Sequence, residues 1–163
     1  MKSQTIFTPL GEPYELTHDE VILEKLRLLN LKDGETLLDL GCGDARSLLA
    51  ARKIANVTCI GYEILPVALK AAIANIKKEK ASNHIEIKEG DFFEADLSNV
   101  DALILYLTRN MLGNLSVKLE NELPVGARIV THDFDIPGWE AEQIIEFQSK
   151  EAFLFTIYVY RKK

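Results

Sequence analysis

The chain has 163 residues, enough for one domain with a substantial core and too few for two ordinary domains. Apolar residues make up 47% and charged residues 27%, the balance of an ordinary globular protein. No apolar run approaches the roughly 18–20 residues of a membrane span, and residues 1–9 lack signal-peptide features. We therefore expect a cytoplasmic protein without a membrane partner. The net charge of −6 also disfavours nucleic acid, because an acidic surface repels phosphates.

The two cysteines, Cys42 and Cys59, lie in separate segments. Neither belongs to a CxxC pair of the kind that binds zinc, and a disulfide is not expected in a reducing compartment. We therefore predict two buried thiols and no metal site.

The first half of the chain alternates helices and strands. Thr17, with Glu20 three residues later, predicts a capping box for a helix over residues 19–30, whose apolar residues recur at helical spacing. The elements predicted next are a strand (36–40), a helix (45–55), a strand (57–62) and a helix (66–80) that begins with Pro66.

The second half continues the alternation and ends in a hairpin. Its predicted elements are strands over 85–88 and 102–106, a helix over 115–123, and strands over 127–132, 143–147 and 153–160. Five strands that alternate with helices predict a parallel sheet with helices on both faces, to which the hairpin adds an antiparallel edge. We predict a single α/β domain over residues 1–163, in which residues 1–16 form a segment that covers the site.

Ligands of open α/β sheets bind beyond the carboxyl ends of the strands. The first predicted strand ends in the turn DLGCGD (39–44), whose two glycines permit a tight turn close to a ligand. A dinucleotide site would need a third glycine where Arg46 stands, and Asp44 would repel a pyrophosphate. The turn instead favours a ligand with an ammonium group, such as S-adenosylmethionine, for which Asp39 and Asp44 are candidate partners.

Acidic residues also follow the next two strands. Glu63, about 20 residues beyond the glycine turn, is placed to accept hydrogen bonds from ribose hydroxyls. Asp91 can accept from the exocyclic amine of adenine, and Phe92 can line the adenine ring. Each signal is weak alone, but three in this order indicate one cofactor site.

The stretches LLDLGCGDARSL, GYE and EGDFFEAD resemble the first three motifs of class I methyltransferases that depend on S-adenosyl-L-methionine. The resemblance covers about residues 17–160. It implies a Rossmann-like, mostly parallel seven-stranded sheet of order 3-2-1-4-5-7-6, with S-adenosyl-L-methionine as the cofactor. The cofactor-binding residues on this interpretation are Asp39, Gly41, Cys42, Gly43, Asp44, Glu63, Asp91, Phe92 and Tyr106.

Other stretches resemble a narrower family, the small archaeal protein-lysine methyltransferases and their mitochondrial relatives, which are non-SET enzymes. The matching stretches are Pro13-Tyr14 with Thr17, and the runs 106–108, 118–130 and 131–139. Where that family carries prolines around its tyrosine and threonine, this chain has Glu15, Leu16 and His18. The resemblance implies methylation of exposed lysines on proteins. We expect a monomer.

A lysine amine, with an ordinary pKa near ~10.4, must lose its proton before it attacks a sulfonium methyl group. An apolar, aromatic channel beside the cationic sulfur lowers that pKa, and cation–π contacts hold the amine. The residues expected to act in catalysis are Tyr14, Tyr106, Thr108, Phe134 and Trp139. No dedicated base is required, because alignment alone can supply about 7–11 kcal/mol.

Three alternatives stay open: a methyltransferase acting on RNA, one acting on a small amine, and a non-catalytic subunit that binds S-adenosylmethionine. The fourth strand ends without the tetrad of Asn or Asp, two prolines and an aromatic residue that marks enzymes methylating amino groups of DNA. RNA would favour a basic face, and a small substrate would favour an inserted lid. A non-catalytic subunit would have a damaged cofactor site, but Asp39, Glu63 and Asp91 are all present.

Overall fold

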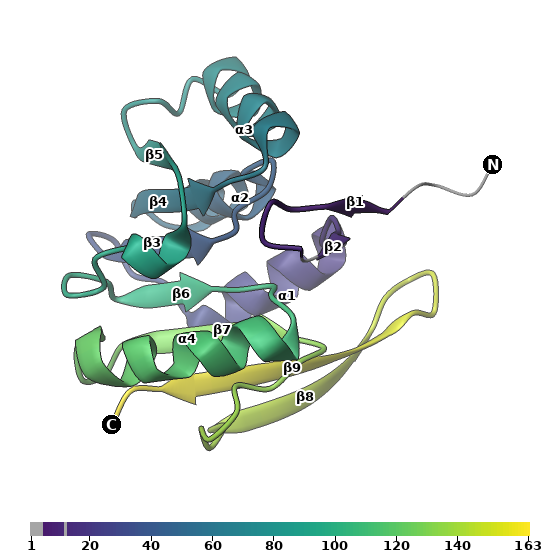
Figure 1. Ribbon diagram of the computed structural model, residues 1–163, viewed down its shortest axis with the longest axis vertical. Coiled ribbons are helices and arrows are strands. Elements are labelled where there is room, and N and C mark those ends of the chain that lie inside the picture. Colours follow the sequence, from purple (N-terminus) through teal and green to yellow (C-terminus); the bar gives the residue numbers. More distant parts are fainter. Residues whose placement is uncertain (1–4, 12) are drawn as a thin grey trace.

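The computed structural model describes residues 5–11 and 13–163 (Figure 1). Residues 1–4 and 12, part of the predicted N-terminal segment, lie outside the described residues. The elements of the described part are β1 (Ile6–Phe7), β2 (Pro13–Tyr14), α1 (Asp19–Leu29), β3 (Thr36–Leu40), α2 (Arg46–Ile54), β4 (Thr58–Glu63), α3 (Pro66–Lys78), β5 (Ile85–Glu89), the 3₁₀ helix η1 (Phe92–Glu94), β6 (Ala102–Ile104), α4 (Arg109–Glu122), β7 (Arg128–His132), β8 (Gln143–Gln148) and β9 (Leu154–Arg161).

Seven strands form the central sheet in the order β5-β4-β3-β6-β7-β9-β8. The strands from β5 to β7 pair in parallel, whereas β9 pairs antiparallel with both β7 and β8. Numbered from β3, this order is 3-2-1-4-5-7-6, so the predicted topology is confirmed. The chain builds outward from β3 to β5 and then returns to place β6 on the other side of β3. The carboxyl ends of β3 and β6 therefore meet at a switch point, where open α/β sheets bind ligands.

Apolar side chains bury the sheet on both faces, because successive strand residues point to opposite sides. On β6, Ala102 and Ile104 pack in the core cluster formed with α1, α2 and α3. Leu103 between them packs in a second cluster, with α4 and the segment 92–100. Figure 1 shows α4 in front of the sheet and α1 behind it. Because both faces of the sheet are covered, the polar side chains that bind a ligand lie at the ends of the strands.

The predicted capping box at the start of α1 is wrong. His18, not Thr17, precedes the helix, and its side chain makes no capping hydrogen bond. Glu20 instead accepts the backbone N–H of Lys150 at 2.9 Å. Lys150 lies in the turn between β8 and β9. The Glu20 carboxylate therefore makes a long-range hydrogen bond instead of the local one that a capping box requires.

The start of α4 also differs from the prediction. The helix begins at Arg109 rather than at Leu115, and Thr108 is its N-cap, accepting the N–H of Met111 at 3.3 Å. Gly113 and Asn114 interrupt the apolar pattern and hid this first part of the helix from sequence reasoning.

An ion pair fixes the end of α1 against the sheet. The Arg128 guanidinium on β7 donates to both carboxylate oxygens of Glu35, at 2.9 and 2.6 Å, and its Nε donates to the Leu29 carbonyl at 2.8 Å. The Arg128 hydrogen bonds hold the pKa of Glu35 below its ordinary value. This arrangement sets the position of α1, and with it the side chains that α1 directs toward the strand ends.

Gly61 on β4 marks the tightest approach between the sheet and the turn that follows β3. A Cβ atom at Gly61 would lie 2.7 Å from Cys42 Sγ and 2.9 Å from Ile87 Cδ1. Because Cys42 is buried in the turn, Gly61→Ala is expected to lower the free energy of unfolding by about 1–3 kcal/mol through overpacking. Urea denaturation measures this change.

Gly113→Ala is the matched control, since the nearest atom to a Cβ there, Pro137 Cγ, is 3.5 Å away. Alanine in the helix α4 is expected to stabilise the protein by about 0.5–1 kcal/mol relative to glycine. Equal stability of Gly61→Ala and the unmodified protein would contradict the close packing of β4 against the turn.

Candidate active site

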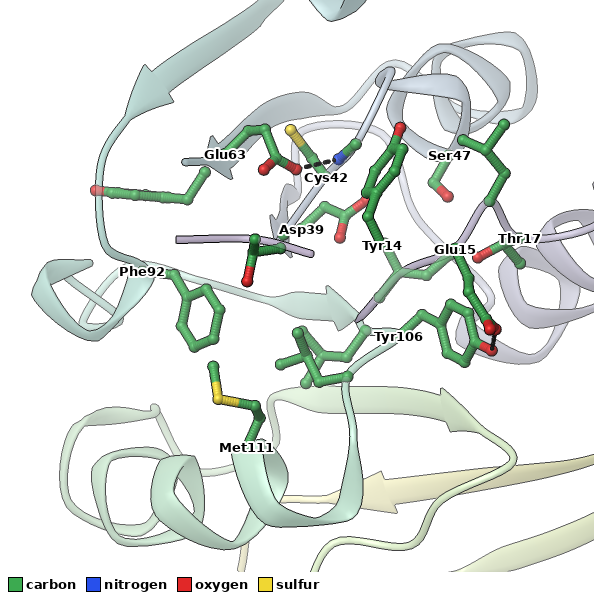
Figure 2. A pocket seen from close by; sticks show the side chains of 18 of the residues that line it. Tyr14, Glu15, Thr17, Asp39, Cys42, Ser47, Glu63, Phe92, Tyr106 and Met111 are labelled. Atoms are coloured by element: carbon green, nitrogen blue, oxygen red, sulfur yellow. Dashed lines mark hydrogen bonds between the residues drawn. The ribbon is translucent and has the colours of Figure 1, made fainter. Parts of the chain in front are cut away.

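A pocket of about 410 Å³ opens at the carboxyl ends of β3, β4 and β6 (Figure 2). This volume lies in the range of small-molecule sites in proteins. Its ionisable lining consists of five acids and two bases: Glu15, Asp39, Asp44, Glu63 and Asp133, with Lys25 and Arg46. The excess of carboxylates favours a ligand that carries positive charge.

Most of the predicted site residues lie at this pocket. Those that line it are Tyr14, Asp39, Gly41, Cys42, Gly43, Asp44, Glu63, Phe92, Tyr106, Thr108 and Phe134. Two others do not line it. Trp139 packs edge-on against Tyr160, with 6.2 Å between ring centroids, in the cluster with α4. Asp91 accepts the N–H of Phe93 at 2.9 Å and so caps η1.

The turn after β3 presents its backbone to the pocket. Gly41 and Gly43 adopt φ angles of +79° and +57°, a region that side chains with a Cβ disfavour. The N–H groups of Gly41 and Cys42 both donate to the carbonyl of Tyr62, at 2.8 and 2.9 Å. These bonds fix the turn against the end of β4, next to Glu63.

Glu63 is held in one orientation by backbone donors. Its Oε2 accepts the N–H of Gly43 at 2.8 Å, and its Oε1 accepts those of Ile64 and Leu65 at 2.9 and 2.8 Å (Figure 2). The residue is 5% exposed and lines the pocket. The two carboxylate oxygens have about four lone-pair sites, and the backbone donors leave one on Oε2, so Glu63 can accept a hydroxyl group of a ligand while it keeps these bonds.

Arg46, which replaces the third glycine of a dinucleotide fingerprint, joins the glycine turn to the segment before α1. Its Nε lies 3.0 Å from Asp44, its Nη1 lies 2.6 Å from Asp19, and its Nη2 donates to the Thr17 carbonyl at 2.9 Å. Asp44 therefore has a cationic partner within the protein, whereas the buried Asp39 faces the pocket.

Sequence reasoning missed a buried lysine beneath the pocket. Lys25 on α1 is 2% exposed, and its Nζ donates to the Leu105 carbonyl at 2.6 Å and lies 3.0 Å from His132 Nδ1. Burial lowers the pKa of Lys25, and Asp39 and Asp133 oppose that shift. Burial raises the pKa of Asp39, and Lys25 opposes it. The available signal was the position of Lys25 within the apolar stripe of its helix.

Tyr106 lies at the pocket between two contacts that sequence reasoning also missed. Its ring stacks on His132, with 3.9 Å between centroids, and its hydroxyl donates to Glu15 Oε2 at 3.0 Å (Figure 2). Burial, followed by the Glu15 hydrogen bond, raises the pKa of Tyr106 above its ordinary value. Burial likewise raises the pKa of Tyr14. Both phenols therefore stay protonated at neutral pH and do not serve as bases.

Two further features concern the described residues only. No group of three His, Cys, Asp or Glu side chains among residues 5–11 and 13–163 is arranged to hold a metal ion. In that same part of the chain, no helix has both the length and the apolar character that crossing a membrane requires.

Comparisons with known sequences identify relatives of this chain. A family profile described as the ANTKMT methyltransferase domain matches residues 39–143. A protein-lysine N-methyltransferase of Saccharolobus islandicus (strain REY15A) is 34% identical over 149 residues, which cover 91% of this chain and 92% of that protein. The adenine nucleotide translocase lysine N-methyltransferase of Mus musculus is 29% identical over 136 residues, 83% of this chain but 59% of that longer protein.

A solved structure agrees with the fold and the cofactor. The RNA methyltransferase from Salinibacter ruber, in complex with S-adenosyl-L-homocysteine, superposes with a TM-score of 0.84 at 29% identity. The match covers 90% of this chain and 93% of that one. The chain is thus an S-adenosyl-L-methionine-dependent methyltransferase, and it belongs to the ANTKMT methyltransferase domain family.

Proposed function

We propose that this enzyme transfers the methyl group of S-adenosyl-L-methionine to the ε-amine of lysine side chains in proteins. The observation that carries the proposal is the composition of the pocket, in which acidic side chains adjoin the aromatic side chains of Tyr14, Tyr106 and Phe134. The protein-lysine N-methyltransferase of Saccharolobus islandicus, which is similar over 91% of this chain, supports the same substrate class.

The residues around the glycine turn fit the cofactor. The pocket is large enough for a nucleoside ligand, the glycine turn lines it, and Glu63 is already oriented by three backbone donors. When bound, the cofactor supplies a methyl group made electrophilic by a positively charged sulfur. Glu63 would accept a ribose hydroxyl and Phe92 would lie against the adenine ring. Asp39 would face the methionine ammonium group.

Several neighbouring residues complete the proposed cofactor site. Gly41, Cys42 and Gly43 would approach the methionine part through their backbone. Asp44 would contact the cofactor while it keeps its ion pair with Arg46. Asp91 would contact the cofactor through the carboxylate oxygen that does not cap η1. The remaining cofactor contact on this proposal comes from Tyr106.

The aromatic side chains would receive the target lysine. The acidic pocket attracts the protonated amine, and the cation–π faces of Tyr14 and Tyr106 hold it. Burial beside another positive charge then favours loss of the proton to solvent. The free lone pair of the amine would then be able to accept the methyl group that the cofactor supplies, with the neutral thioether of S-adenosyl-L-homocysteine as the leaving group. Thr108 caps α4 at the rim, and we assign it a positioning role there.

RNA methylation is the second candidate, because the similar Salinibacter ruber protein is described as an RNA methyltransferase. The net charge of −6 and the acidic lining of the pocket weigh against it, since both repel a phosphate backbone. A small amine and binding without turnover are the other outcomes that the first assay distinguishes.

We further propose a monomeric enzyme that acts in the cytoplasm, without a nucleic-acid or membrane partner. The acidic composition supports this for nucleic acid. Light scattering coupled to size-exclusion chromatography tests the assembly state.

Lysine-rich proteins, RNA and small amines, each incubated with the enzyme and labelled S-adenosylmethionine, test the substrate class. We expect the label on lysine side chains of proteins, identified by mass spectrometry, and we expect Asp39→Asn to reduce it. Label on RNA or a small amine alone would overturn the lysine assignment but keep the methyltransferase. Tight cofactor binding with no labelled product would point to a non-catalytic subunit.

Glu63→Gln tests the cofactor half of the site. The substitution removes a charged acceptor, and hydrogen bonds to charged groups contribute about 1.5–3 kcal/mol, so the Kd for S-adenosylmethionine is expected to rise about 10- to 100-fold. Isothermal titration calorimetry gives this Kd directly. Glu86→Gln, at an exposed position on β5, is the control with the same chemical change. Equal Kd values for the two variants would show that Glu63 does not bind the cofactor.

A further inference from the structure

One buried amine group lines the active-site pocket, between α1 and the sheet. Lys25 Nζ donates to the Leu105 carbonyl at 2.6 Å and lies 3.0 Å from His132 Nδ1. Leu105 directly follows β6, and His132 is the last residue of β7, the strand that pairs with β6. A single side chain from the helix layer therefore joins the ends of two adjacent strands.

The contact with Lys25 determines the state of the imidazole. A protonated Lys25 amine can only donate, in which case His132 Nδ1 accepts and the neutral ring carries its proton on Nε2. Burial, and then the charge of Lys25 and of His18, lower the pKa of His132 far below its ordinary value. This shift favours the neutral imidazole.

The imidazole in turn holds an active-site side chain. The His132 ring stacks on Tyr106 with an interplanar angle of 25°, and Phe155 contacts it edge-on at 6.1 Å between centroids. At the other end of the Tyr106 side chain, the hydroxyl donates a hydrogen bond to Glu15. The position of Tyr106 therefore depends on a contact chain that starts at Lys25.

We propose that Lys25 is a positioning residue for methyl transfer: its two hydrogen bonds fix the end of β6 and the tautomer of His132, and the fixed imidazole holds the Tyr106 ring at the pocket. We call this arrangement of Lys25, His132 and Tyr106 the clamp. It does not depend on which substrate receives the methyl group, and it rests on the proposed lysine methylation only for its turnover assay.

A purely structural role does not account for a lysine at this position. The neighbouring stripe residues Val21, Ile22, Leu26 and Leu29 are apolar and at most 3% exposed. An apolar side chain would complete that stripe without the desolvation that a buried amine suffers. What an apolar side chain cannot provide is a donor for the Leu105 carbonyl and for His132.

Charged and titratable groups face the clamp from several elements. Asp39 reaches it from β3, Asp133 from the residue after β7, and His18 from the start of α1. Glu15 lies beyond Tyr106. His132 is the group whose titration reports on the clamp, because the protonation states of Lys25 and Asp39 depend on each other.

Three variants test the clamp. Lys25→Met keeps the length of the side chain and removes both donors, whereas Lys25→Arg keeps donors and charge. Lys118→Met is the control: Lys118 on α4 is also largely buried, pairs with Glu122, and does not line the pocket. We expect Lys25→Met to lower kcat on a protein substrate about 10- to 100-fold, because a displacement of about 1 Å has that effect. kcat is compared at saturating S-adenosylmethionine, because Lys25 also lies near Asp39, which the proposal assigns to the cofactor.

Lys25→Arg is expected to recover part of kcat, and Lys118→Met to leave it unchanged. An unchanged kcat in Lys25→Met, or an equal loss in Lys118→Met, would overturn the proposal.

Imidazole nitrogen NMR provides a readout that a merely structural role would not move. In the unmodified protein, His132 is expected as the Nε2–H tautomer, without titration between about pH 5 and 8, the range in which an ordinary histidine changes charge. In Lys25→Met its pKa should rise, because the repelling positive charge is gone. A His132 ring protonated at Nδ1 in the unmodified protein would refute the clamp even if Lys25→Met fails to fold. Absence of methyl-lysine with a correct tautomer would instead reject only the substrate assignment.

Discussion

The parallel pairing of β3 with β4 on one side and β6 on the other is the constraint on which the site depends. The order in which successive strands are added reverses there, so the turn after β3 faces open space instead of a neighbouring crossover. Burial of both sheet faces confines useful polar groups to the strand ends. The glycine turn, Glu63 and Tyr106 all stand at those ends because the interior of the sheet has no place for them.

Charge pairing within the pocket gives its carboxylates different roles. Arg46 neutralises Asp44 and attaches the glycine turn to the segment before α1. Lys25 lies beside the buried Asp39 and moderates the effect of burial on its pKa. Glu63 needs no cation, because three backbone N–H groups hold it. Carboxylates still outnumber cations in the pocket lining. The pocket therefore suits a cationic substrate and a cationic cofactor better than a phosphate.

The segment before α1 contributes to the site although it lies outside the sheet. Tyr14, at the end of the short hairpin strand β2, approaches the glycine turn, and its hydroxyl would be 3.5 Å from a Cβ atom at Gly43. Glu15 next to it binds Tyr106 across 91 residues of sequence. The segment therefore closes one wall of the pocket with side chains that belong to neither face of the core.

The sequence by itself determined the fold class, the strand order through its family resemblance, and the positions of the glycine turn and Glu63. Apart from the strand order, these follow from local periodicity and from turn chemistry, which act over a few residues. Only the tertiary structure decided that Trp139 packs against Tyr160, that Thr108 caps α4, and that Glu20 serves the hairpin instead of its own helix. It also decided the contact between Lys25 and His132, which are separated by 107 residues. A side chain's partner across such a distance depends on how helix and sheet pack together, and no local pattern in the sequence specifies that packing.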